Sequence, residues 1–294
     1  MLAGAAPLAW RAALAQAPLA LVTCDAQARL AVLDLGSRRV VRSIATLPDP
    51  RSIELVGSRA VVCHSATGAV SIVDGKRVLH VLRGLAEPRY TAAHPDGVHA
   101  FVTDSGRSGV VAIDVLRGRV LGRVRLPGWA RHLTIDASGE RLWVGLGSAS
   151  PQVAVVDTKR LRHVSTLEPG YPAHDVGVAP DGRLWVTSGS ERKLTAAGGV
   201  RPADAAPQHV TFGRGVAYVT SGDDGTLHVQ SLADGRILRS ARIPIGSYNV
   251  QYGWGQVLTP SLSHGTLAVL DAAGAPQAVV NVADSCHDAC FSPT

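Results

Sequence analysis

Short apolar runs recur along the whole chain and are separated by turns rich in Gly, Pro and Asp. Seven of these runs open in the same way, with a small residue or Pro, then a polar pair, then alternating apolar positions. They begin at Pro50, Pro88, Ala130, Ala173, Pro207, Ser247 and Cys286, so that successive starts lie 38, 42, 43, 34, 40 and 39 residues apart. Alternation with a period of two predicts strands, and a repeat of about 40 residues predicts stacked supersecondary units.

Three further runs follow within each repeat. The second is rich in aromatic and β-branched residues, as in Phe101 to Asp104, and the third ends in Asp, as in Val111 to Asp114. The fourth follows a basic or Gly-containing turn, as in Arg119 to Gly122. Four antiparallel strands per repeat of about 40 residues predict an all-β, seven-bladed β-propeller. Residues 19–294 then form a single domain, preceded by an Ala-rich leader or remnant of an export signal at residues 1–18.

The chain begins with a second strand (residues 19–24) and ends with a first strand (residues 286–291). We therefore expect these two strands to pair in a composite blade that closes the ring. Cys286 starts one strand and Cys24 ends the other, so the two could come within the 5.5–6 Å Cα spacing of a disulfide. The alternative is that all four cysteines (Cys24, Cys63, Cys286 and Cys290) are free thiols in the core.

Two turns contain Pro-Asp-Gly, at residues 95–97 and 180–182, and three second strands share a related motif: Phe101-Val102-Thr103-Asp104, Trp185-Val186-Thr187-Ser188 and Tyr218-Val219-Thr220-Ser221. In these motifs the chain resembles the YVTN-type propellers, lactonase-like and surface-layer-like, of bacterial surface and exported proteins. The resemblance covers residues 19 to the C-terminus and implies the fold, but it does not imply a function. The segment from Ser190 to Pro207 departs from the repeat, and we expect short, irregular outer strands there.

The composition fits a large core, with 46% hydrophobic and 18% charged residues. It excludes a disordered chain and a disulfide scaffold, and no apolar stretch is long enough for a transmembrane span. The net charge is +6, but the Arg residues are scattered and form no basic cluster, which argues against nucleic-acid binding. We expect a monomer.

The N-terminal sequence MLAGAAPLAWRAALA ends in Ala-Leu-Ala, the pattern of a signal-peptide cleavage site. This favours an exported, periplasmic or extracellular protein, with a cytoplasmic location as the alternative.

The polar pairs that open the seven first strands should converge near the propeller axis. We call them the first column and the second column. The first column is Arg51, Arg89, Arg131, His174, Gln208, Tyr248 and His287, and the second column is Ser52, Tyr90, His132, Asp175, His209, Asn249 and Asp288. Successive strand residues point in opposite directions, so only some of these side chains can face the axis. The candidate ligand-binding residues are Arg51, Arg89, Arg131, His132, His174, Asp175, His209, Tyr248, His287 and Asp288.

Three interpretations of this hub stay open. Arg51, Arg89 and Arg131 could hold a carboxylate or phosphate of a small anionic molecule. Alternatively, His174 and His287, with His132 or His209, could ligate a divalent metal while Asp175 and Asp288 orient the imidazoles. In the third, the polar residues only solvate a water-filled channel.

The sequence therefore favours an exported ligand-binding or protein-interaction scaffold with a polar hub. A metal-dependent lyase or hydrolase that uses the hub histidines is the alternative. No known nucleophile, phosphate-loop or dinucleotide-binding motif occurs, so the sequence assigns no catalytic residue and leaves open whether the protein is an enzyme.

Overall fold

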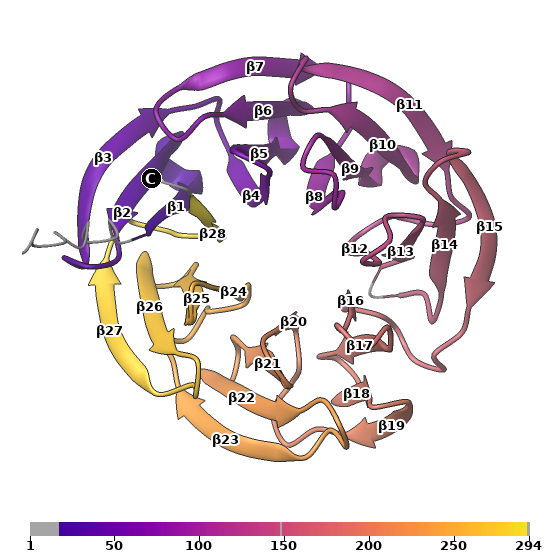
Figure 1. The fold of residues 1–294 in the computed structure, drawn as a ribbon, viewed down its shortest axis with the longest axis vertical. Coiled ribbons are helices and arrows are strands. Elements are labelled where there is room, and N and C mark those ends of the chain that lie inside the picture. Colours follow the sequence, from indigo (N-terminus) through magenta and orange to yellow (C-terminus); the bar gives the residue numbers. More distant parts are fainter. Residues whose placement is uncertain (1–17, 148, 293–294) are drawn as a thin grey trace, which may run out of the picture.

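The computed structural model describes residues 18–147 and 149–292, which form a ring of seven four-stranded antiparallel sheets around a central channel (Figure 1). This confirms the predicted seven-bladed propeller. The export signal proposed for residues 1–15 lies outside the described residues.

In each blade the four strands follow one another outward from the channel (Figure 1). The innermost strands are β28 (Ala289–Ser292), β4 (Pro50–Val56), β8 (Pro88–Ala93), β12 (Leu133–Ile135), β16 (Asp175–Val178), β20 (His209–Phe212) and β24 (Gln251–Gly253). The second strands are β1 (Leu19–Cys24), β5 (Arg59–His64), β9 (His99–Asp104), β13 (Arg141–Gly145), β17 (Leu184–Ser188), β21 (Val216–Ser221) and β25 (Gln256–Ser261).

The third strands are β2 (Arg29–Asp34), β6 (Ala69–Val73), β10 (Gly109–Asp114), β14 (Val153–Asp157), β18 (Lys193–Ala196), β22 (Thr226–Ser231) and β26 (Thr266–Asp271). The outer strands are β3 (Arg39–Ala45), β7 (Val78–Arg83), β11 (Arg119–Arg125), β15 (Arg162–Leu167), β19 (Gly199–Pro202), β23 (Ile237–Arg242) and β27 (Pro276–Asn281). Among the described residues, three 3-10 turns join second to third strands: η1 (Asp25–Gln27), η2 (Ser65–Thr67) and η3 (Ser105–Arg107). No helix among the described residues is long and apolar enough to cross a membrane.

Burial explains the Val-rich composition. Every residue of β10 and β14 is buried, because each sheet packs against a neighbouring blade on both faces. The outer strand β3, by contrast, has one buried residue in seven. Each fully buried Val, Leu or Ile contributes about 1.5–3 kcal/mol relative to an exposed one, so the inner three strands of each blade supply most of the apolar stabilisation.

The ring closes as the sequence predicts, because β28 pairs with β1 in the sheet order β28-β1-β2-β3, with Leu21 opposite Cys290. Cys24 and Cys286 lie in the same apolar cluster, at the end of β1 and just before β28, the two strands that close the ring. The two are free thiols in the structure, however, as are Cys63 and Cys290, and no disulfide joins them.

Two inner strands, β4 and β8, begin with a bulge that orients their hub residues. In β4, Pro50 pairs with His64 and Ile53 with Val62, so that Arg51 and Ser52 together lie opposite a single residue. The same shift occurs between Pro88 and Thr91 in β8. In three blades a Thr hydroxyl of the second strand accepts the backbone N–H of the second-column residue. Thr103 does so for Tyr90 (3.1 Å), Thr187 for Asp175 (3.1 Å) and Thr23 for Asp288 (2.8 Å).

The departing repeat forms the blade β16-β17-β18-β19. Its two outer strands have four residues each, as the sequence predicts for length. Their pairing from Lys193–Pro202 to Ala196–Gly199 is continuous, however, so these strands are short rather than irregular.

Candidate functional site

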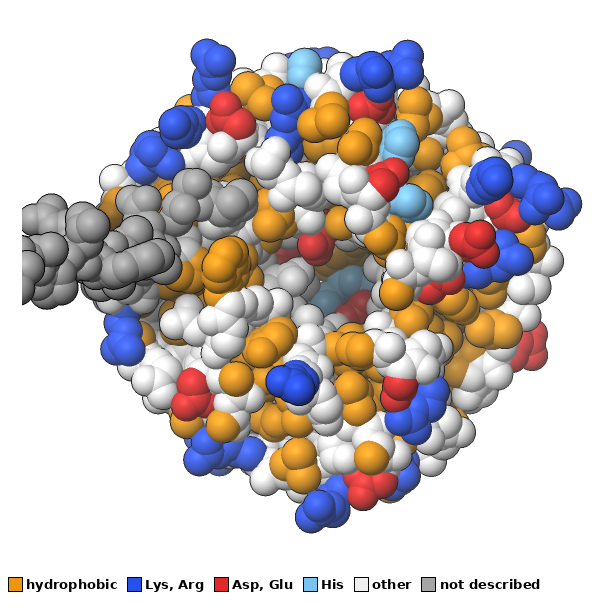
Figure 2. All heavy atoms as spheres, in the orientation of Figure 1, with side chains coloured by type: hydrophobic (Ala, Val, Ile, Leu, Met, Phe, Trp, Pro, Cys, Tyr) orange, Lys and Arg blue, Asp and Glu red, His pale blue; other side chains and the backbone are white. Residues whose placement is uncertain are grey.

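The central channel contains a cavity of about 210 Å³ that follows the inner strands from their first residues toward their ends. All seven second-column residues line it: Ser52, Tyr90, His132, Asp175, His209, Asn249 and Asp288. Figure 2 shows the hollow at the centre of one face, with histidine and acidic side chains deep inside it. First-column residues do not line the cavity. The second column is therefore the one that faces the channel.

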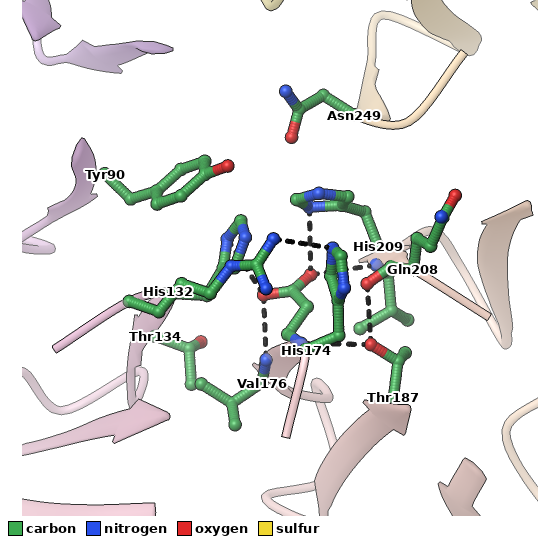
Figure 3. A network of polar contacts seen from close by, with 12 residues as sticks. Tyr90, His132, Thr134, His174, Val176, Thr187, Gln208, His209 and Asn249 are labelled. Atoms are coloured by element: carbon green, nitrogen blue, oxygen red, sulfur yellow. Dashed lines mark hydrogen bonds and ion pairs between the residues drawn. The ribbon is translucent and has the colours of Figure 1, made fainter. Parts of the chain in front are cut away.

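Three histidines from neighbouring blades meet at this point, as Figure 3 shows: His132 just before β12, His174 just before β16 and His209 at the start of β20. One ring nitrogen from each lies within 4.8 Å of the others. The ring centroids of His132 and His209 are 4.3 Å apart, and those of His174 and His209 are 5.2 Å apart. We call these three residues the His cluster.

Asp175 lies between two members of the His cluster. Its carboxylate is 3.5 Å from Nδ1 of His132 through one oxygen and 3.5 Å from Nδ1 of His209 through the other. The same oxygens accept the backbone N–H groups of Val176 (2.7 Å) and Val210 (3.0 Å). A carboxylate at Nδ1 fixes the imidazole tautomer and leaves Nε2 available, which is the usual arrangement behind a metal-bound histidine.

Nε2 of His132 is buried and has no hydrogen-bond partner. Leaving a buried polar atom unpaired costs about 1–3 kcal/mol, so the position calls for a partner that the protein chain does not supply. Burial lowers the pKa of His132 and of His174 well below the ordinary value. Both imidazoles are therefore neutral near pH 7, which is the form that binds metals.

Tyr90 and Arg131 border the His cluster. The Tyr90 ring lies 3.5 Å, centroid to centroid, from the His132 ring, and burial raises the pKa of its hydroxyl. An N–H of the Arg131 guanidinium donates to Nε2 of His174 at 3.3 Å. A metal ion bound by Nε2 of His174 would have to displace this guanidinium, which would then be available to a ligand on the metal.

The three Arg of the predicted arc are half-buried and do not line the cavity. Arg89 pairs with Glu87 (2.9 Å) and lies over the Trp129 ring at 4.7 Å. Nε of Arg51 is buried without a hydrogen-bond partner. Arg51 and Arg89 both act electrostatically on Tyr90, as Arg131 does, so their charges converge on the hub.

The other predicted residues lie apart from the His cluster. The Tyr248 hydroxyl donates to Asp223 at 3.0 Å. His287 contacts Asn249, whose amide donates to the backbone oxygen of His287 (2.8 Å) and lies 3.3 Å from its Nδ1. The carboxylate of Asp288 accepts the backbone N–H groups of Ile53 (3.0 Å) and Ala289 (2.8 Å). The sequence named His174 and His287 as the metal pair, whereas the structure groups His174 with His132 and His209 and leaves His287 outside.

The sequence does not predict two further contributors. Tyr90 belongs to the second column but is not among the predicted binding residues, and the Thr residues of the second strands are predicted only as part of a strand motif. Ring order was the available signal: His132, Asp175 and His209 are second-column residues of three consecutive blades, so they had to be neighbours.

The fold and the hub define a class of protein, the seven-bladed β-propeller with a cluster of histidines on its axis. The chain is similar in structure to Kuenenia stuttgartiensis hydrazine synthase, with a TM-score of 0.74 and 17% identity, over 86% of this chain and 92% of that chain. It is equally similar (TM-score 0.74, 12% identity) to a protein of unknown function from Desulfotomaculum acetoxidans, over 93% of this chain and 98% of that one. No family model matches the sequence, and no curated protein does. At these identities the similarity shows the fold alone.

Proposed function

We propose that this protein is a ligand-binding propeller whose hub holds a divalent transition-metal ion through His132, His174 and His209. The observation that carries the proposal is the unpartnered, buried Nε2 of His132 beside two other imidazoles, one ligand atom of each lying within 4.8 Å of the others. Three imidazoles bound to one metal at 2.0–2.1 Å lie about 3.4 Å apart, so small ring rotations would complete the site.

The donor set selects the metal. Neutral imidazoles suit Zn²⁺, Cu²⁺ and Ni²⁺, whereas Ca²⁺ and Mg²⁺ prefer carboxylate and carbonyl oxygens. Asp175 would act behind the metal, because its oxygens already face Nδ1 of His132 and His209 and are held by two backbone amides. It would stabilise the imidazoles without binding the metal itself.

The ligand proposed for this site is a small anion. Three histidines leave at least one coordination position open, and Arg131 already contacts the His cluster. Arg51 and Arg89 add positive charge on the same side of the hub. A carboxylate or phosphate would satisfy both the metal and the guanidinium groups.

The metal assignment is tested by measuring Zn²⁺ bound per chain after purification without an affinity tag, together with calorimetric titration. His132→Ala, His174→Ala and His209→Ala should each lose one tightly bound equivalent. His287→Ala is the matched control, because it removes a hub histidine outside the His cluster, and it should keep that equivalent. A wild-type protein that takes up no Zn²⁺, Cu²⁺ or Ni²⁺ at the hub, or equal loss in His287→Ala, would overturn the assignment.

The anion assignment is tested by thermal shift with small carboxylates and phosphates on the metal-loaded protein. Arg51→Ala and Arg131→Ala should abolish the response. Arg160→Ala is the control, since Arg160 is an exposed residue paired with Asp157 on the outside of a blade. A response that survives both hub substitutions would contradict the proposal.

Metal-dependent lyase or hydrolase activity is the second candidate function. It is favoured by the three-imidazole set itself, because catalytic zinc sites use three protein ligands and keep one position open. A zinc ion bound there supplies Lewis acidity and a water of lowered pKa. Hydrolysis or elimination that depends on added Zn²⁺ and is lost in His209→Ala would support this function, whereas turnover that persists in His209→Ala would exclude this site as its origin.

The proposal includes export to the periplasm or the cell exterior, which rests on the Ala-Leu-Ala pattern of residues 13–15. Fractionation of cells that express the natural gene, with the N-terminus of the mature protein sequenced, tests it. A cytoplasmic protein that retains residues 1–15 would contradict it.

A further inference from the structure

A second group of metal-binding side chains lies far from the hub histidines in sequence, in the loop between β8 and β9. The loop reads His94-Pro95-Asp96-Gly97-Val98-His99. His94, Asp96 and His99 each offer one ligand atom, and these atoms lie within 4.8 Å of one another. The side chains are 23%, 36% and 41% exposed, so an ion in solution can reach them.

One carboxylate oxygen faces both imidazoles. Oδ2 of Asp96 lies 2.6 Å from Nδ1 of His99 and 3.0 Å from Nδ1 of His94. The other oxygen, Oδ1, accepts the backbone N–H groups of Val98 (2.8 Å) and His99 (3.0 Å), which fix the carboxylate in place. Although partial burial opposes it, these hydrogen bonds hold the pKa of Asp96 below its usual range, so the carboxylate is charged.

Nδ1 of both histidines faces the same carboxylate oxygen. Without a metal, a proton on each Nδ1 can be donated to Oδ2 of Asp96, and these contacts help to lower the pKa of that carboxyl. A divalent cation bound between the three groups would take the place of these protons and would be attracted by the charge of the carboxylate.

The His94 ring is held in position by the neighbouring blade. A Cβ on Gly139 would lie 2.3 Å from Nε2 of His94, so the absence of a side chain at Gly139 allows the ring to pack on this backbone. Because Gly139 has a φ of +76°, it also occupies a conformation that other residues rarely adopt. The ring is thus pre-oriented with Nδ1 toward Asp96.

The chain contains a natural comparison for this loop. The turn between β16 and β17 has the same Pro-Asp-Gly sequence, but an Ala precedes it and Arg183 follows it. There the guanidinium Nε of Arg183 donates to the Asp181 carboxylate at 2.9 Å and neutralises its charge. In the β8–β9 loop no Arg or Lys takes this place, and two imidazoles face the Asp96 carboxylate instead.

We propose that His94, Asp96 and His99 form a second divalent metal site on the surface of the propeller, with Nδ1 of each histidine and Oδ2 of Asp96 as ligands. Two imidazoles and one carboxylate select Cu²⁺, Ni²⁺ or Zn²⁺ over Ca²⁺ and Mg²⁺. Glu140 and Lys159 line the adjacent recess with His94 and His99. The site is independent of the proposed hub function.

The experiment titrates the full chain with Cu²⁺ and with Zn²⁺ in a calorimeter and counts the equivalents bound. His174→Ala, which alters only the hub, should keep the loop equivalent. His94→Gln, Asp96→Asn and His99→Gln should each weaken that equivalent by at least about tenfold, because even the loss of a residue behind a metal ligand costs 10–100-fold.

Two further variants sharpen the test. Val98→Arg places an Arg directly after Pro-Asp-Gly, as in the β16–β17 turn, and should weaken or abolish the loop equivalent by pairing with Asp96. Asp181→Asn is the matched control and should leave the loop equivalent unchanged. Nδ1 and Cε1 resonances of His94 and His99 that broaden on addition of substoichiometric Cu²⁺ would place the ion at this loop. A loop equivalent that survives in the His94→Gln/His99→Gln double variant, or the absence of any equivalent in His174→Ala, would overturn the proposal.

Discussion

The dipeptide His-Asp occurs twice at the hub, as His174-Asp175 and as His287-Asp288, and the two copies have the same backbone role. In each, one carboxylate oxygen accepts the N–H of the next residue: Val176 at 2.7 Å in the first copy and Ala289 at 2.8 Å in the second. The other oxygen accepts an N–H from the next blade. That donor is Val210 in the first copy and Ile53 in the second, both at 3.0 Å.

The two copies differ in the residues that the adjoining blades supply. The carboxylate oxygens of Asp175 face Nδ1 of His132 and Nδ1 of His209. The blades on either side of Asp288 supply Asn249 and Ser52 at the same positions of the repeat, and Asn249 bonds to His287 instead. The His-Asp pair is therefore a tether between blades in both places, and the neighbouring blades decide whether it also supports chemistry.

The largest effect is expected on stability, when the tether between blades that Asp175 and Asp288 each provide is removed. Asp175→Ala and Asp288→Ala should each lower the free energy of unfolding by about 3 kcal/mol, because each leaves two backbone N–H groups without an acceptor in a buried place. Urea denaturation followed by circular dichroism measures this. If only one of the two variants were destabilised, the two carboxylates would not be equivalent tethers.

The next largest effect is expected on metal affinity, where Asp175 and Asp288 should differ. Asp175→Asn should lower the affinity of the hub for Zn²⁺ by 10–100-fold, since a carboxylate behind a metal-bound imidazole raises its basicity. Asp288→Asn should leave the affinity within about twofold, because Asp288 contacts backbone amides and no member of the His cluster. Calorimetric titration of the two variants compares them directly, and equal losses would show that the distinction is wrong.

The stability of the protein should depend on pH through Glu54, which lines the channel close to Asp288. Burial raises the pKa of Glu54 to about 7, while an N–H of Gln251 donates to it at 3.2 Å. A raised carboxyl pKa means that the folded state holds its proton more tightly than the unfolded state. This contribution to stability is complete below about pH 4.5 and is lost as the pH rises through 7.

Between pH 4.5 and pH 8, wild type should therefore lose about 2 kcal/mol of stability relative to Glu54→Gln, since one pKa unit corresponds to 1.36 kcal/mol and channel water reduces the full shift. Urea denaturation of both proteins across this range measures the difference. Parallel pH profiles for the two proteins would contradict the prediction.

The smallest expected effect is the gain of a weak Zn²⁺ site beside His287. The double substitution Ser52→His and Asn249→His would give His287-Asp288 the flanking residues that His174-Asp175 already has. We expect one additional, weakly bound Zn²⁺ equivalent in calorimetric titration, with Asn249→His alone as the control that adds none. No gain in the double variant would mean that the adjoining second-column residues are insufficient, and that Tyr90 or Arg131 is also required.

Much of the site could be predicted from sequence. The repeat fixed the blade count, the strand order and the ring closure, because the seven polar pairs recur at nearly constant spacing. It also placed His132, Asp175 and His209 on consecutive blades. That order is enough to predict that these three side chains lie close together. His174 and His287, by contrast, are three blades apart in the ring, so the same order argues against their binding one metal.

The sequence by itself determined the propeller, its composite blade and the two columns of hub residues, because these follow from local periodicity and the order of the repeats. Only the tertiary structure decided which column faces the channel. That choice depends on the backbone at the start of the inner strands, which is bulged in β4 and β8 and is held by Thr hydroxyls at Tyr90, Asp175 and Asp288. It also decided that His174 joins the His cluster and His287 does not, because each imidazole takes its partner from an adjoining blade. Contacts of this kind join residues 34–43 positions apart in the chain, and they form only when consecutive blades pack against each other.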